Sequence, residues 1–349
     1  MKGLVFKEPG KVSLMEVEKP EILHPQDAIV RITATTICGS DVHLAEGHIP
    51  TTPGYVMGHE YVGEVVETGD LVKQLEKGCR VAGPAAPYCG QCANCREGNI
   101  SHCLQGGVHG SGPEFGNLPG SHSEYIRVPF ADLNLVPVPE GVTDEQALFV
   151  GDILSTGYTG VLNCRVQTGD HVVIFGAGPV GLSAVMTARL FGPAKIILVG
   201  NRDEFRLEKG KSLGADETIL GSKEDVQARI MELTGGRGAD VVIDAAGAPS
   251  TVQSSLRCAR IGGRVALMAL YPMPIEFPMQ EVGMKNLTIT MGLGNLGYMR
   301  RLMDMIAQGQ LDPSPLVSHR FPLDEAEEAY RLFRSREDNV LKVILRPAG

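Results

Sequence analysis

The chain has 349 residues, more than one ordinary domain usually holds, and 43% of them are hydrophobic, which is enough for two packed cores. Its net charge of −9 argues against nucleic acid or an anionic membrane surface as the main partner. The N-terminal twenty residues lack an apolar stretch of signal-peptide length, and no run approaches the ~18 apolar residues of a membrane helix. We therefore expect a cytoplasmic protein.

The N-terminal half is predicted to be mostly β. Up to about residue 150, short runs rich in β-branched residues alternate with Gly and Pro, as in "AIVRITATTI" (28–37) and "YVGEVVETG" (61–69). Such runs are typical of strands in a barrel or a sandwich.

The pattern changes after residue 150 to alternating strands and helices. Expected strands are 171–175, 195–200, 217–220, 239–247 and 262–270. One expected helix follows the glycine turn at 176–181, a second ends at Gly214, a third covers 223–234 and a short fourth lies near 250–258. This alternation predicts a parallel, doubly wound sheet. A helix in "YMRRLMDMIAQG" and a strand in "VLKVILRP" are expected to end the chain.

A dinucleotide-binding turn is predicted at 176–181, where Gly176, Gly178 and Gly181 form G-x-G-x-x-G around Pro179 and Val180. The motif follows a strand and opens a helix, which is the context that gives it meaning. The first glycine allows a tight turn, the second lets a pyrophosphate approach the backbone, and the third permits close packing of helix and strand.

The end of the next strand favours NADP over NAD. NAD sites usually carry an acidic residue there, whereas this chain has Gly200, Asn201 and Arg202. Glycine removes the charge that would repel a 2′-phosphate, and Arg202 can bind that phosphate. The alternative is that Arg202 is a solvated loop residue and that Asp203 or Glu204 contacts the ribose.

Four cysteines crowd into "CGQCANCREGNISHC": Cys89, Cys92, Cys95 and Cys103. Two short C-x-x-C steps and a fourth thiol after a small loop predict a closed, tetrahedral structural zinc site. A nucleic-acid-binding zinc ribbon disagrees with the acidic charge, and an iron–sulfur cluster has no other support.

Two stretches carry further candidate metal ligands: Cys38, Ser40, Asp41 and His43 in "TTICGSDVH", and His59 and Glu60 in "MGHEYVG". Each such residue alone is more often an ordinary core residue than a ligand. Asp152 adds a carboxylate in the apolar run "LFVGDILSTGYTG", with no basic residue within ten positions. Because a buried carboxylate without a partner is costly, Asp152 is either a helix N-cap or a metal ligand.

These motifs together resemble one known family. The pattern G58-H59-E60-x-x-G63-x5-G69-x-x-V72, the four-cysteine lobe and the later glycine turn resemble zinc-containing alcohol dehydrogenases of the medium-chain dehydrogenase/reductase family. The resemblance covers essentially the whole chain. It implies an α/β plus mostly-β fold: a GroES-like catalytic domain at 1–152, completed by 291–349, and a Rossmann domain at 153–290.

The resemblance also implies the ligands of a second, catalytic zinc, so that each chain would hold two zinc ions. Cys38 and His59 match the first two family ligands, and Asp152 matches the third, where many relatives have cysteine and polyol dehydrogenases have glutamate. Aspartate resembles a subset that includes NADP-dependent secondary-alcohol dehydrogenases and glutathione-independent formaldehyde dehydrogenases. Three protein ligands leave one position open.

Three further residues receive catalytic roles. Ser40 and His43 match the family's proton relay, which works through the cofactor ribose; otherwise Ser40 caps backbone and His43 is a surface residue. Glu60 is interpreted as a residue behind the ligands or a transient ligand. Asp41 either orients a ligand through hydrogen bonds or caps a local turn.

The sequence therefore predicts a zinc-dependent dehydrogenase that transfers a hydride between a secondary alcohol, or its ketone, and NADP(H). The alternatives are an NAD-linked polyol or formaldehyde-type dehydrogenase and a zinc-stabilised binding protein without turnover. The expected partner is a small-molecule alcohol or carbonyl compound, with no nucleic acid and no membrane. The resemblance further suggests a homodimer or homotetramer.

Overall fold

A computed structural model describes residues 1–348, which divide into two compact units. One unit joins Met1–Ser155 to the segment that begins at Asn295, and the other is Thr156–Gly294. The boundaries expected from the sequence, at 152 and 291, lie a few residues from these limits. Among the described residues, no helix is both long and apolar enough to span a membrane.

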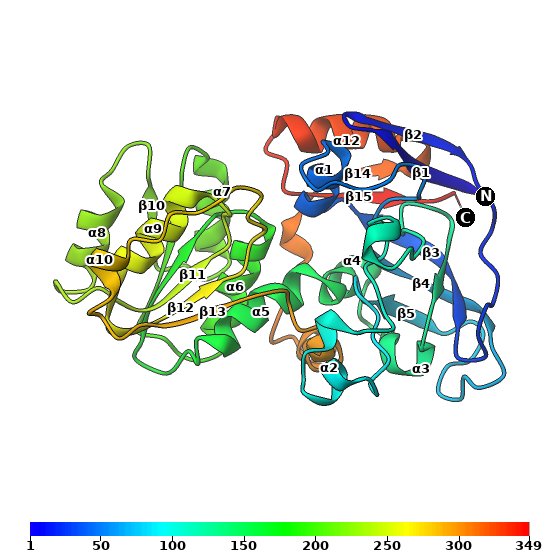
Figure 1. Ribbon diagram of the computed structural model, residues 1–349, viewed down its shortest axis with the longest axis horizontal. Helices are drawn as coiled ribbons and strands as arrows, with labels where there is room; N and C mark the ends of the chain where they lie inside the picture. The colour runs from blue at the N-terminus through cyan, green and yellow to red at the C-terminus, as the bar shows by residue number, and fades with distance from the viewer. Residues whose placement is uncertain (349) are drawn as a thin grey trace. The chain divides into compact units, whose positions relative to one another are not determined.

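The unit Thr156–Gly294 is built on a six-stranded, wholly parallel sheet in the order β10-β9-β8-β11-β12-β13 (Figure 1). Its strands are β8 (His171–Phe175), β9 (Lys195–Gly200), β10 (Glu217–Leu220), β11 (Ala239–Asp244), β12 (Ala259–Leu267) and β13 (Thr288–Met291). Their near-continuous apolar runs are typical of parallel strands covered on both faces.

The helices of this unit lie against that sheet: α6 packs on β8 and β9, α7 on β9 and β10, and α9 on β11 and β12. The helices are α5 (Ile153–Asn163), which begins in the other unit, α6 (Pro179–Arg189), α7 (Glu204–Ser212), α8 (Val226–Leu233), α9 (Pro249–Cys258) and α10 (Met279–Val282). The alternation of strands and helices predicted from the sequence is confirmed, and so is the doubly wound fold class.

Two helix ends differ slightly from the sequence-based expectation. The helix expected from residue 223 begins at Val226, because Asp225 is its N-cap and accepts a hydrogen bond from the amide of Ala228 (3.0 Å). Helix α7 ends at Ser212, and the expected C-terminal glycine, Gly214, follows with φ of +115°, a backbone conformation that favours glycine.

The other unit is mostly β, as expected (Figure 1). Its main sheet has the order β14-β15-β3-β4-β5-β7, with β6 also paired to β3, and a separate hairpin joins β1 to β2. The strands are β1 (Lys2–Glu8), β2 (Lys11–Glu16), β3 (Ala28–Thr36), β4 (Glu60–Thr68), β5 (Arg80–Gly83), β6 (Tyr125–Val128), β7 (Val136–Pro137), β14 (Val317–Pro322) and β15 (Lys342–Arg346).

Short helices connect these strands: α1 (Gly39–Ala45), α2 (Ala93–Arg96), α3 (Ala131–Asn134), α4 (Asp144–Ala147), α11 (Met299–Ala307) and α12 (Ala326–Ser335), with 3-10 turns η1 (Ile100–His102), η2 (Pro113–Phe115), η3 (Leu148–Gly151), η4 (Leu296–Tyr298), η5 (Ser314–Leu316) and η6 (Leu323–Glu325). The C-terminal strand β15 pairs antiparallel with β3, so the end of the chain completes this sheet.

Candidate metal centres and cofactor site

Sheet register brings the predicted catalytic ligands together. β3 pairs antiparallel with β4, and Thr36 lies opposite Glu60. Cys38 follows the end of β3 by two residues and His59 precedes β4 by one, so the same pairing places both near one end of the sheet. Two ligands that are twenty-one positions apart in the sequence thereby become neighbours.

Asp152 reaches the same place from η3. Gly151 allows the approach, because a Cβ there would lie 2.1 Å from the carbonyl oxygen of Gly83. Asp152 Oδ2 is 3.4 Å from Cys38 Sγ and 3.3 Å from His59 Nε2. Asp152 lies between η3 and α5, and its carboxylate contacts the other two candidate ligands.

The donor atoms of Cys38, His59, Glu60 and Asp152 all lie within 4.8 Å of one another. Sulfur, imidazole nitrogen and carboxylate oxygen are the donors that zinc prefers. Moreover, Glu60 Oε2 is buried and has no hydrogen-bond partner among the described residues, and a metal ion beside it would satisfy this acceptor. The residues present therefore fit a zinc ion.

Asp41 serves both roles that the sequence left open. As part of a capping box it accepts a hydrogen bond from the amide of Cys38 (2.8 Å) and so starts α1. Its second oxygen lies 3.1 Å from His59 Nδ1, which orients the imidazole so that Nε2 faces Cys38 and Asp152. Burial opposes the ionised form, but His59 and the Cys38 amide together lower the pKa of Asp41.

Glu60 has a partner that the sequence analysis missed, the wholly buried Lys342 on β15. Lys342 Nζ donates to Glu60 Oε1 (2.5 Å) and to the carbonyl of Ile37 (2.9 Å). Burial raises the pKa of Glu60 to about 7, although Lys342 opposes that shift. Burial lowers the pKa of Lys342, but Glu60, Cys38 and Asp152 together outweigh it and raise that pKa overall.

This ion pair balances the charge of Glu60. A carboxylate beside Cys38 and Asp152 would make a zinc site net negative, whereas the buried lysine supplies one positive charge to balance it. Glu60 can thus stay close to the ligands without weakening a Lewis acid there. A pairing of residues 282 positions apart left no local signal in the sequence.

The two predicted relay residues lie three positions apart on α1, so Ser40 and His43 share a face of that helix. Ser40 Oγ is 3.4 Å from His59 Nε2, next to the candidate ligands. His43 is half-buried, and its Nδ1 lies 3.2 Å from Nδ1 of His48. The structure thus places Ser40 beside the candidate metal ligands and His43 one helical turn further along.

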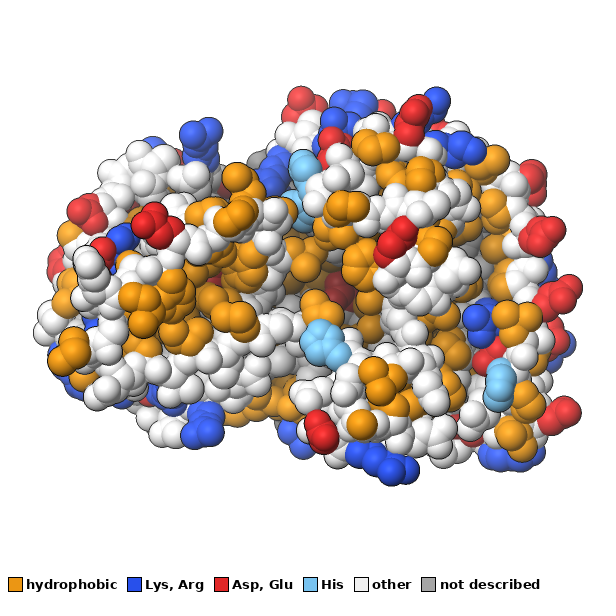
Figure 2. Space-filling model, in the orientation of Figure 1, with side chains coloured by type: hydrophobic (Ala, Val, Ile, Leu, Met, Phe, Trp, Pro, Cys, Tyr) orange, Lys and Arg blue, Asp and Glu red, His pale blue; other side chains and the backbone are white. Residues whose placement is uncertain are grey.

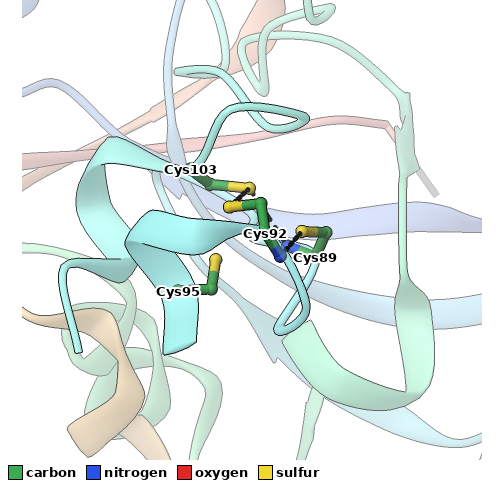
Figure 3. Close-up of side chains that lie close together, drawn as sticks. All are labelled: Cys89, Cys92, Cys95 and Cys103. Carbon is green, nitrogen blue, oxygen red and sulfur yellow. Dashed lines mark hydrogen bonds between the residues drawn. The ribbon is translucent and has the colours of Figure 1, made fainter. Parts of the chain in front are cut away.

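The four-cysteine lobe forms a second candidate zinc site, in which the sulfur atoms converge (Figure 3). Backbone amides donate to these sulfurs, as from Cys89 to Cys103 (3.2 Å) and from Cys92 to Cys89 (3.3 Å). Such hydrogen bonds stabilise thiolates. Several of them lower the pKa of Cys92 to about 6, and the hydrogen bond from the amide of Leu104 contributes most. None of the four forms a disulfide among the described residues.

The glycine turn matches each requirement of a dinucleotide site. Gly176 has φ of +101°, and a Cβ at Gly181 would lie 1.8 Å from the carbonyl oxygen of Gly176. A Cβ at Gly178, by contrast, would meet no atom within 4 Å, so space is open beside that backbone. Pro179 then begins α6, whose N-terminus favours an anion.

The residues after β9 lie where the sequence placed them. Gly200 ends the strand, and a side chain there would crowd Leu207, with a Cβ 2.9 Å from its Cδ2. Asn201 and Arg202 are exposed. The two nearby acids have other partners: Asp203 is the N-cap of α7 and pairs with Arg206 (2.9 Å), and Glu204 pairs with Lys223.

Comparison with known proteins gives matches over both units. Residues 24–140 match the alcohol dehydrogenase GroES-like domain, and residues 179–308 match the zinc-binding dehydrogenase family model. The chain is 39% identical to an alcohol dehydrogenase of Cupriavidus necator and 34% identical to the NADP-dependent isopropanol dehydrogenase of Thermoanaerobacter brockii, each over 99% of both proteins. It is also similar to the solved structure of an alcohol dehydrogenase from Thermus sp. ATN1, with a TM-score of 0.94 and 40% identity over 100% of both chains.

Proposed function

The chain belongs to the zinc-containing alcohol dehydrogenases of the medium-chain dehydrogenase/reductase family, and on that premise we propose that it transfers a hydride between a secondary alcohol, or its ketone, and NADP(H). Membership makes the chain an oxidoreductase and removes the alternative of a binding protein without turnover. The observation that carries the proposal is the convergence of Cys38, His59 and Asp152 beside Glu60.

Cys38, His59 and Asp152 would hold the catalytic zinc, and Cys89, Cys92, Cys95 and Cys103 the structural one, giving two zinc ions per chain. When bound, the catalytic zinc acts as a Lewis acid towards the oxygen of an alcohol or carbonyl group. Asp41 fixes the tautomer of His59 through Nδ1, and Lys342 holds Glu60 as a compensated carboxylate behind the ligands.

Oxidation of an alcohol releases one proton, which this chain's own residues must carry away. Ser40 has a hydroxyl beside His59 Nε2, where it can exchange a proton with a substrate oxygen. His43 lies one turn further along α1 and can accept that proton at neutral pH. We therefore assign Ser40 to the substrate end of the relay and His43 to the base that takes the proton further from the substrate.

The preference for NADP rests on the charges after β9. Asp203 and Glu204 are engaged with Arg206 and Lys223, which leaves Arg202 as the exposed charged side chain next to Gly200. An exposed guanidinium with no acid at position 200 suits a 2′-phosphate better than a 2′-hydroxyl. The T. brockii relative, named for NADP and isopropanol, supports the same assignment.

Steady-state rates with small secondary alcohols, polyols and aldehydes, each with NADP and NAD, test the proposal. We expect the highest kcat/KM for a secondary alcohol with NADP, and an Arg202→Ala variant that loses most of the NADP preference but keeps its rate with NAD. Undiminished preference in that variant would contradict the role of Arg202. Preference for a polyol or formaldehyde with NAD would favour the alternative dehydrogenase.

Metal analysis tests the two sites separately. We expect two zinc ions per chain, the loss of one together with activity in Asp152→Ala, and the loss of the other in Cys103→Ala. A single zinc in the wild-type chain would contradict the assignment of a catalytic zinc to Cys38, His59 and Asp152.

We also infer that the chain forms a homo-oligomer through the edge of its parallel sheet. β13 ends the sheet and has no further strand beside it among the described residues. Large apolar side chains are exposed in the segment that connects β12 to β13 and at the end of β13: Met273, Met279, Met284, Met291 and Leu293. Apolar side chains gather over β12 and β13 in Figure 2. An open edge of this kind favours a second copy of the chain as partner.

A further inference from the structure

The end of α1 has a regular capping geometry that involves two histidines. The amide of Gly47 donates to the carbonyl of Leu44 (3.0 Å), and the amide of His48 donates to the carbonyl of His43 (2.9 Å). Gly47 has φ of +74°. These two hydrogen bonds and the left-handed glycine form a Schellman motif, which brings the residue after the glycine back over the last turn of the helix.

In most Schellman motifs the two side chains brought together are apolar, whereas here they are imidazoles. Nδ1 of His43 and Nδ1 of His48 are 3.2 Å apart, and the ring centroids are 5.4 Å apart. A hydrogen bond between two imidazole nitrogens requires a proton on one and a free lone pair on the other. His48 is exposed to solvent while His43 is half-buried, so the pair leads outward from the protein.

The other charges near this pair come from α12 and the residue after it. Arg336 raises the positive potential at His43, and Arg334 is paired with Glu46 at the end of α1 (2.8 Å). Burial, then the charge of His48, then that of Arg336 lower the pKa of His43. A proton on His43 is therefore disfavoured by its surroundings and will move to a neighbouring acceptor.

We propose that His48 is the terminal group of the proton relay and transfers the proton of alcohol oxidation from His43 to water. This inference rests on the proposed function, because it needs a reaction that releases a proton. It assigns a role to a residue that follows α1 and has no contact with the candidate zinc ligands among the interactions described above.

The transfer is a balanced sequence of proton movements. As a relay hydroxyl loses its proton, that proton forms a bond to Nε2 of His43, and the bond from Nδ1 of His43 to its own proton breaks as that proton bonds to Nδ1 of His48. The exposed His48 then loses the proton on its Nε2 to water. A flip of each ring, or exchange of the protons of both imidazoles with water, then restores the starting tautomers, and ketone reduction runs the same steps in reverse.

His48→Asn and His48→Phe separate the relay from simple packing. Asparagine keeps a polar atom near the position of Nδ1 and phenylalanine keeps the ring, but neither passes a proton at neutral pH. In stopped-flow alcohol oxidation with zinc-loaded enzyme, a pH-indicator dye reports proton release while absorbance reports NADPH. General acid–base groups typically accelerate a reaction about 10²–10⁴-fold. The loss should be smaller here, because His43 can still lose its proton slowly to water, and we expect both variants to release the proton ~10-fold more slowly.

Two further readouts distinguish the relay from a structural or electrostatic effect. Added imidazole should restore the rate of proton release in both variants and leave wild type unchanged. Histidine NMR of the full-length protein should show a higher pKa for His43 in His48→Asn. Arg336→Gln is the matched control, because it also removes a positive charge near His43 but should release protons at the wild-type rate and gain nothing from imidazole.

The outcomes separate this inference from the proposed function. A wild type that oxidises alcohols, with His48 variants that release protons at the wild-type rate or are not rescued by imidazole, would overturn the role of His48 alone. A wild type that oxidises no alcohol with either cofactor would overturn the proposed function and the relay with it.

Discussion

Lys342 is the residue on which the charge balance around Glu60 depends, because it is the buried cation that contacts this buried carboxylate. Lys342→Met leaves Glu60 without its partner, and removing one member of a buried pair typically costs ~3–5 kcal/mol. We expect a clear fall in the temperature of thermal unfolding and weaker zinc retention at Cys38, His59 and Asp152. Calorimetry and metal analysis of the purified protein measure both effects.

The double variant Glu60→Gln/Lys342→Met is the control for that prediction. It removes both charges, so it should recover most of the lost stability while zinc chemistry still suffers from the missing carboxylate. If the single and double variants were equally unstable, packing of the lysine chain and not its charge would be responsible.

His109 makes the stability of the fold sensitive to acid. It is fully buried, its Nδ1 contacts the carbonyl of Pro119 (2.8 Å), and burial lowers its pKa to about 3. The folded pKa lies below the unfolded value of about 6.5, so its stabilising contribution is complete above that pH and is lost as the pH falls towards 3. The loss is ~1.4 kcal/mol for each pH unit within that window.

Unfolding free energies measured from pH 7 down to the acid limit test this expectation. His109→Asn keeps a donor for Pro119 and does not titrate, so the wild-type protein should lose stability more steeply than the variant below pH ~6.5. His24→Asn, at an exposed histidine, should follow wild type. Parallel curves for wild type and His109→Asn would show that His109 does not cause the acid sensitivity.

At the scale of single elements, the parts that could be predicted from the sequence are those with a local pattern. The cysteine lobe lies within fifteen residues, and the turn at Gly176–Gly181 has a fixed spacing between a strand and a helix. Lys342 escaped prediction because its contact with Glu60 depends on the pairing of β15 with β3. The contact of His48 with His43 depends on how the backbone turns after α1, which one glycine alone does not specify.

The turn between β8 and α6 offers a matched pair of glycine variants. Gly178 has an ordinary φ of −83°, and a methyl group there would lie in open space. A methyl group at Gly181 would instead lie 1.8 Å from the carbonyl oxygen of Gly176. We expect Gly178→Ala to unfold like wild type but to bind NADPH at least ~10-fold more weakly, since the pyrophosphate needs that space. Gly181→Ala should lose stability itself.

Cofactor titration and thermal unfolding of the two variants provide the measurements. Wild-type affinity in Gly178→Ala would mean that the dinucleotide does not pass this backbone. A stable Gly181→Ala would mean that α6 can move away from β8 at little cost, against the close packing seen at that position.

At the scale of the whole molecule, the division into two units could be predicted from a change in sequence pattern near residue 150. That the C-terminal segment rejoins the first unit could not be predicted from this pattern. Strand β15 joins the N-terminal sheet beside β3 and brings Lys342 to Glu60. Only the family resemblance indicated that the C-terminal segment completes the first unit, because no periodicity in the strand itself specifies its partner.

The proposed oligomer makes the last prediction, because its interface would bury the apolar edge at β13. Met284 and Met291 are the most exposed of the side chains there, at 89% and 69%. Met284→Glu/Met291→Glu places two carboxylates on that edge, where a second copy would have to bury them. We expect size-exclusion chromatography with light scattering to give two or four chains for wild type and half that mass for the variant, while zinc content is retained.

Leu23→Glu, which changes an equally exposed apolar residue (71%) in the other unit, is the control and should keep the wild-type mass. A monomeric wild type would contradict the oligomer. A variant with the wild-type mass would show that the copies meet at another surface.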